Sequence, residues 1–205
     1  MTESSDNIRL KKRAYHHGNL RAAVMIAALK LVAKRGPSGF TLAEAAKMAG
    51  VVPSALYRHF ADRETLLAAI ALEGFEALIA NLQSALKASE NDPRESLVSF
   101  GIEYFRFASH QPAHFQVMFG AEIEKGKYPD LLDAACRTLD LLTQITQKLD
   151  PNWKDLAATT WAMIHGTSLL ALDRSFERTD LCRQPETLLK NSLFALAASM
   201  KIQPV

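Results

Sequence analysis

The sequence predicts an all-α fold of about nine helices: a three-helix head with a helix-turn-helix, one long connecting helix, and a helical body. Apolar residues recur with the 3.6-residue spacing of helices along nearly the whole chain, and no stretch alternates as a strand does. The breaks fall at Pro, Gly, Asn and Asp, which cap or end helices. The composition agrees, since 48% of the 205 residues are hydrophobic and Gly and Pro are few.

The first element of the head is a helix that follows a polar arm. Residues 1–18 are predicted to form a flexible arm, which carries a basic cluster between positions 9 and 13. Such an arm either lies along nucleic-acid phosphates and grooves or serves only as a solubilising tail, and both interpretations stay open. The first helix is expected from about Asn19, a good N-cap, to Arg35, with Gly36 as its stop.

The segment from residue 41 to residue 60 predicts the helix-turn-helix. Thr41 and Glu44 have the spacing of a capping box at the start of its first helix. Gly50 permits the left-handed step that ends this helix, and Pro53 suits the first turn of the second. In this plan the second helix presents its N-terminal residues to base edges in the major groove of DNA. The head is therefore taken as residues 19–65.

The remainder, residues 66–205, forms the body, which the connecting helix enters. Asp62 is expected to cap that helix, and apolar spacing carries it to about Lys87, a length of about 38 Å. Long enough to reach from head to body, it would join the two rigidly. Further helices are predicted near 93–109, 112–119, 129–149, 153–177 and 185–201.

Charge is divided unevenly between the two parts. Residues 1–63 carry 11 Lys and Arg against 4 Asp and Glu, a net charge of +7, and the rest carries −5. A basic head on an acidic body predicts that the head meets a polyanion. Two cysteines make no disulfide framework, and the N-terminus has no apolar core of signal-peptide length. Because no apolar run approaches the ~20 residues of a membrane span, we expect a cytoplasmic protein without a membrane partner.

A set of head residues resembles the TetR family of bacterial transcriptional regulators. The most specific part is the run Leu56-Tyr57-Arg58-His59-Phe60, and the other matching positions are Gly36, Phe40-Thr41, Ala45-Ala46, Ala49-Gly50-Val51 and Leu66-Leu67. The resemblance implies an all-helical homodimer. It assigns DNA binding to residues 19–65 and ligand binding and dimerisation to residues 66–205.

Candidate DNA contacts lie on the second helix and at its flanks. Ser54 can hydrogen-bond several bases, and Pro53 and Ala55 can pack on a thymine methyl group. This small set predicts that Arg58 and DNA shape supply part of the specificity. Phosphate contacts, which the resemblance implies, fall on Thr41, Tyr57, His59 and Arg63. A packing role for Tyr57 and a purely capping role for Thr41 remain open.

One head of this size buries too little surface for tight specific binding, so two heads on a two-fold axis are expected to read a palindromic operator. The resemblance places the dimer face on the last two helices, about 153–177 and 185–201. Their apolar residues spread further around each helix than one intramolecular face requires.

The body also holds a cluster of aromatic residues and methionine. Most of them are interpreted as core, and the alternative is a cavity for a small apolar or amphipathic effector. The stretch from Trp161 to Gly166 resembles the Trp-His-Gly signature of one TetR C-terminal class. The candidate ligand-binding residues are Tyr104, Phe105, Phe115, Met118, Phe119, Trp161 and His165.

These observations predict a DNA-binding transcriptional repressor that a small molecule releases from its operator. The alternative is an effector-independent or partner-recruited architectural DNA binder, which a body without a cavity would favour. An enzyme is excluded, because no Gly-rich phosphate loop, nucleophile elbow or metal cluster occurs in the sequence. No cofactor and no metal site are expected.

Overall fold

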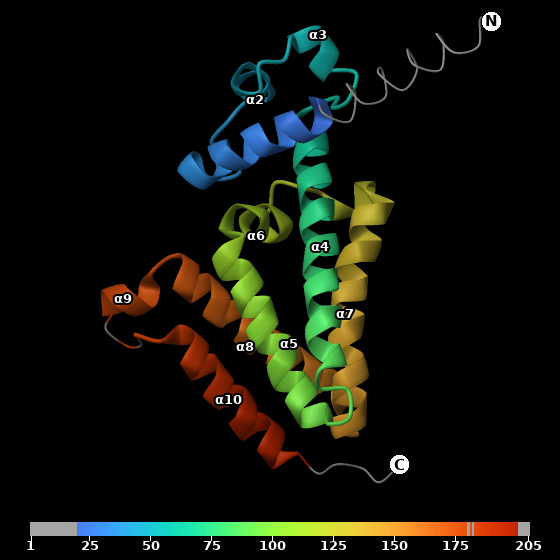
Figure 1. Cartoon of the computed structure of the whole chain (residues 1–205), viewed down its shortest axis with the longest axis vertical. Helices are drawn as coiled ribbons and strands as arrows, with labels where there is room; N and C mark the ends of the chain where they lie inside the picture. Colours follow the sequence, from blue (N-terminus) through green and yellow to red (C-terminus); the bar gives the residue numbers. More distant parts are fainter. Residues whose placement is uncertain (1–19, 180, 182, 201–205) are drawn as a thin grey trace, which may run out of the picture.

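The structure is a computed structural model that describes residues 20–179, 181 and 183–200. The basic arm, the capping role of Asn19 and the second cysteine, Cys182, fall outside the described residues. Within these ranges the chain is helical and contains no strand, which confirms the predicted fold class. Figure 1 shows a head at one end of an elongated molecule and a bundle of helices at the other.

The head contains three helices. The first spans residues 20–35, and the helix-turn-helix follows as α2 (Leu42–Met48) and α3 (Pro53–Leu56). The predicted capping box is confirmed: the Thr41 hydroxyl accepts from the Glu44 amide at 3.2 Å, and the Glu44 carboxylate accepts from the Thr41 amide at 2.8 Å. Both α2 and α3 lie on the side of the head that faces away from the body (Figure 1).

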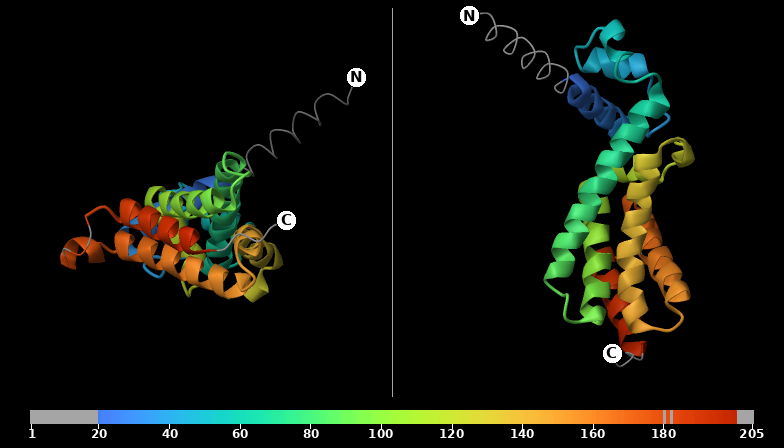
Figure 2. Two further views of the ribbon diagram at one scale, coloured as in Figure 1. Left: turned by 90° about the horizontal axis from the view of Figure 1, so that it is seen from below. Right: turned by 90° about the vertical axis from the view of Figure 1, so that its right-hand side faces the viewer.

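The connecting helix α4 (Arg63–Lys87) runs from the head through the length of the body (Figures 1 and 2). Its predicted cap is confirmed, since the Asp62 carboxylate accepts from the Thr65 amide at 2.7 Å. By length and composition α4 could cross a membrane, but about half of that stretch is buried inside the protein, as a core helix of a soluble protein also is. The helix packs on α5, α6 and α7.

Besides α4, the body contains six further α-helices in the described part of the chain. They are α5 (Pro93–His110), α6 (Pro112–Phe119), α7 (Pro129–Leu149), α8 (Trp153–Leu172), α9 (Ser175–Thr179) and α10 (Pro185–Ser199), with a 3₁₀ turn, η1 (Lys125–Lys127), before α7. Helix α5 lies at the centre, because it packs on α4, α7, α8 and α10.

The predicted helix over 153–177 is wrong as one element, because it breaks into α8 and α9. Arg174 takes a left-handed backbone with φ of 60°, which few non-glycine residues adopt. The Asp173 carboxylate accepts from the Ser175 amide at 2.8 Å and so caps the new helix start. This break raises the number of helices in the described residues above the predicted nine.

The other boundaries differ at helix ends. The helix predicted over 185–201 stops at Ser199, because Met200 is extended and its carbonyl accepts from the Arg94 guanidinium at 2.6 Å. The second helix of the helix-turn-helix is one turn long. It ends at Leu56, and residues 57–59 continue as a turn in which the His59 amide donates to the Leu56 carbonyl at 2.8 Å.

Asp62 offers a direct test of the junction between head and α4. Hydrogen bonds from Thr65 lower the pKa of its carboxyl group, so the folded state holds the charged form more strongly than the unfolded chain. Asp62→Ala is expected to reduce the free energy of unfolding at pH 7 by about 1 kcal/mol. Because the folded-state pKa of Asp62 lies below the unfolded value of about 4, the wild-type advantage is complete above that pH and should decline as pH falls through the lowered pKa. Urea titrations at pH 7 and pH 3 measure both effects, and an equal difference at the two pH values would contradict this role.

Candidate nucleic-acid interface and effector cavity

The turn between α2 and α3 holds the two helices at a fixed angle. Gly50 has a φ of 68°, the left-handed conformation predicted for it, and the Val51 amide returns to the Ala46 carbonyl at 2.9 Å. Leu56 and Phe60 are 1% exposed and anchor the second half of the motif in the head core. Of the three residues between these two anchors, Tyr57 and Arg58 are therefore held on the outside.

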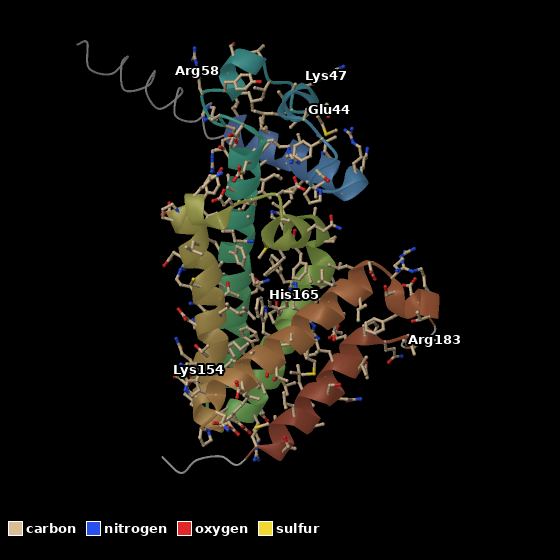
Figure 3. All side chains as sticks on the ribbon, turned by 180° about the vertical axis from the view of Figure 1, so that it is seen from behind. Glu44, Lys47, Arg58, Lys154, His165 and Arg183 are labelled. Carbon is tan, nitrogen blue, oxygen red and sulfur yellow. The ribbon has the colours of Figure 1, made fainter. Side chains whose placement is uncertain are left out.

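The predicted base-reading and phosphate-contacting residues divide between exposed and partly buried positions. Tyr57 is 59% exposed, and Ser54 and Arg58 are also exposed, whereas Ala55 and His59 are half-buried. Figure 3 shows Arg58 at the outer end of the head. Pro53 begins α3, and its side chain lies outside the described part of the structure.

Thr41 and Arg63 already have partners within the protein. The Thr41 hydroxyl belongs to the capping box. The Arg63 guanidinium donates to the Pro37 carbonyl, forms an ion pair with Glu122 of the body, and lies over the Phe40 ring at 5.9 Å. Arg63 therefore ties the head to the loop between α6 and η1. A phosphate contact by either residue stays a prediction.

Sequence reasoning missed Lys47. This residue is exposed in the last turn of α2 and lies on the same outer end of the head as Arg58 (Figure 3). The first helix of a helix-turn-helix crosses the DNA backbone, so a lysine there suits a phosphate. A charge at an outward position of the capped helix was the available signal.

The aromatic cluster of the body surrounds a partly buried hydrogen bond. The Tyr104 hydroxyl lies 2.9 Å from His165 Nδ1, and the rings of Phe115 and Phe119 pack against the imidazole with centroid distances of 5.4 and 4.7 Å. Burial lowers the pKa of His165 and raises the pKa of Tyr104. The imidazole lies between α5, α6 and α8, where burial disfavours its charged form, and Figure 3 shows it inside the body.

Four of the seven candidate ligand-binding residues belong to the core. Tyr104, Phe105, Phe115 and Met118 are at most 6% exposed, which favours the core interpretation for them. His165 is half-buried beside them. Their ligand role stays a prediction.

The remaining two candidates, Phe119 and Trp161, line a half-open cavity of about 260 Å³ between α4, α6, η1, α7 and α8, named here the α7–α8 cavity. Its other walls come mainly from α7, a helix for which the sequence indicated no ligand role. A larger hollow of about 410 Å³ lies between α4, α5 and α10. Charged groups line it, among them the Arg106–Glu186 ion pair, so it suits an apolar ligand less well. Among the residues described, no cluster of three His, Cys, Asp or Glu side chains could hold a metal.

The basic head, its outward-facing Tyr57 and Arg58, and the long helix to a separate bundle define a DNA-binding protein of the helix-turn-helix class. Two family models match the chain: residues 24–70 match bacterial regulatory proteins of the tetR family, and residues 97–195 match the tetracyclin repressor-like C-terminal domain. The chain belongs to the TetR family of transcriptional regulators. It is a regulator and not an enzyme. The finer resemblance to the Trp-His-Gly class stays a prediction.

Solved structures share this fold. A protein of unknown function from Rhodococcus sp. RHA1 is 25% identical, with a TM-score of 0.77 over 91% of this chain and 97% of that one. A tetR-family regulatory protein from Rhodococcus RHA1 is 19% identical, with a TM-score of 0.68 over 90% and 98%. A TetR-family regulator from Marinobacter aquaeolei VT8 is 21% identical, with a TM-score of 0.68 over 93% and 100%. Comparison with curated protein sequences gives no match.

Proposed function

We propose that this regulator is a cytoplasmic repressor that binds a palindromic operator as a homodimer and leaves it when a small apolar or amphipathic effector binds the body. The observation that carries the proposal is the pairing of an outward-facing helix-turn-helix with an apolar cavity in the body that α4 helps to line. Homodimers are typical of the family. The α7–α8 cavity also favours this function over an effector-independent DNA binder, whose body would need no such hollow.

Four exposed residues support a dimer face on α8 and α10. Leu169 and Leu170 on α8 are 46% and 44% exposed, and Leu188 and Phe194 on α10 are 42% and 47% exposed. The two helices pack on each other and lie side by side at the edge of the body (Figures 1 and 3). A second copy would cover this apolar surface.

The DNA-binding part of the proposal is tested by selecting duplexes from a random-sequence pool with the purified protein. The expected product is an inverted repeat whose half-site centres lie about one helical turn, or a multiple of it, apart. Enrichment of no sequence, or of a single half-site bound by a monomer, would refute the palindromic operator. Salt titration of the selected duplex then reports the number of phosphates neutralised.

Arg58→Ala is expected to weaken binding to the selected duplex by about 1–3 kcal/mol and to relax the preference at the base pair it contacts. Lys154→Ala is the matched control, because it removes the same charge from an exposed residue at the opposite end of the molecule (Figure 3). Fluorescence anisotropy at fixed salt measures both variants. An equal loss of affinity for the duplex in the two variants would mean that Arg58 acts only through net charge.

A further inference from the structure

Large apolar side chains that face solvent gather at the α7–α8 cavity. Leu132 and Leu139 on α7 and Trp161 on α8 are 44%, 37% and 37% exposed, and all three line it. The buried ring of Phe75 and the partly buried ring of Phe119 line it too. Exposed apolar surface concentrated in a hollow marks a place where a ligand binds.

One cation stands among these apolar groups. Lys125 lines the cavity and is half-buried, and no carboxylate within the described ranges forms an ion pair with its ammonium group. Lys127, two residues later, is exposed and pairs with Glu124 at 2.8 Å. Burial lowers the pKa of Lys125, because its charge is partly withdrawn from water. A bound anion would supply the missing counter-charge.

Few polar groups other than Lys125 line the cavity and could anchor a ligand. The Thr138 hydroxyl already donates to the Ala134 carbonyl at 3.1 Å, one turn back in α7. Cys136 is exposed and contributes a weakly polar thiol. Lys125 is therefore the group that would fix the polar end of a ligand.

We propose that the α7–α8 cavity binds an amphipathic carboxylate, with its apolar tail against Phe75, Leu139 and Trp161 and its carboxylate on the Lys125 ammonium. This inference rests on the proposed function, for which it names the effector class. If each water-sized group occupies about 30 Å³, a cavity of about 260 Å³ accommodates about nine heavy atoms. An eight-carbon acid, with ten heavy atoms, is close to this size.

The carboxylate position adjoins the contact between body and head. Glu122, three residues before Lys125, is the partner of Arg63, and the Glu124 amide donates to the Glu64 carboxylate at 3.1 Å. Arg63 and Glu64 form the first turn of α4. A ligand that draws Lys125 toward the cavity therefore acts on the loop that holds this end of α4, provided that it binds one arrangement of the loop better than the other.

The test is calorimetric titration of the full-length protein, without DNA, with three probes of one chain length: octanoate, octanol and octylamine. Octanoate is expected to bind more tightly than octanol, and octylamine least. Lys125→Met keeps the aliphatic stem, so it should weaken octanoate roughly tenfold or more while leaving octanol unchanged. Lys125→Arg should restore octanoate binding. Lys127→Met is the matched control and should change neither affinity.

Each alternative result overturns the proposal in a recognisable way. Equal affinities for octanoate and octanol, or an octanoate affinity that Lys125→Met leaves unchanged, would remove Lys125 as the anchor. Binding of no probe, with Leu139→Arg converting the dimer to a monomer by sedimentation, would show that a second copy covers the cavity. Because these titrations contain no DNA, they can fail while the selected palindrome stands, and they can succeed if operator binding fails.

Discussion

Replacing Phe115 by alanine is expected to lower the free energy of unfolding by about 3–5 kcal/mol. Phe115 is 0% exposed and packs against Tyr104, Phe119 and His165 with ring-centroid distances of 5.7, 4.8 and 5.4 Å. Its removal leaves a cavity at the centre of the body, where neighbouring rings have no room to collapse. Since domains of this size have a free energy of unfolding of only about 5–15 kcal/mol, this single change removes a large part of the stability.

Tyr57→Ala is the control for the loss of a ring of similar size. Tyr57 is 59% exposed in the head, so its truncation should change stability by no more than about 0.5 kcal/mol. Urea unfolding followed by far-UV circular dichroism measures both variants. A loss below about 1 kcal/mol in Phe115→Ala would mean that the cluster is loosely packed, and would return these residues to the effector-cavity interpretation.

Local signals were enough to predict the elements that local chemistry controls. The Thr41–Glu44 capping box, the Asp62 cap and the left-handed Gly50 each depend on residues within four positions. The break at Arg174 escaped prediction because apolar spacing continues across it. A non-glycine residue with positive φ leaves no mark in composition.

The positions at which helices approach each other closely could not be predicted from the sequence, for a different reason. A Cβ added to Gly101 would lie 2.3 Å from Leu193 Cδ1, so α10 packs directly on α5 there, and one added to Gly74 would lie 2.6 Å from Met118 Sδ. Gly166, in the Trp-His-Gly resemblance, has nothing within 4 Å of such a Cβ. All three glycines sit in apolar stretches, and only the three-dimensional arrangement distinguishes them.

The candidate site shows the same division between local and distant contacts. The exposure of Ser54, Tyr57 and Arg58 follows from the helix-turn-helix pattern itself. The ion pair of Arg63 with Glu122 joins residues 59 positions apart, and the α7–α8 cavity gathers side chains from five elements. Apolar periodicity assigns a residue to a face of its own helix but does not say which distant helix that face meets.

A charge on the proposed dimer face should have the largest effect on operator binding. Leu170→Asp combined with Leu188→Asp places four carboxylates in a two-fold interface, because each position occurs twice in an isologous contact. An unpaired charge buried in an apolar contact costs several kcal/mol, so the dimer should dissociate. Each head would then bind its half-site alone, and operator affinity should fall by about 100-fold or more through loss of effective concentration.

Ile26→Asp is the control for the oligomeric state, because Ile26 is 55% exposed on the first helix, away from α8 and α10. Analytical ultracentrifugation should show a monomer for the double variant and a dimer for the control. Circular dichroism should show native helicity in both, since Leu170 and Leu188 are more than 40% exposed within one chain.

A double variant that stays dimeric and keeps its operator affinity would move the interface elsewhere. The next surface to consider would be the exposed apolar row of α7, and the carboxylate proposal for the α7–α8 cavity would then compete directly with a second copy for the same side chains.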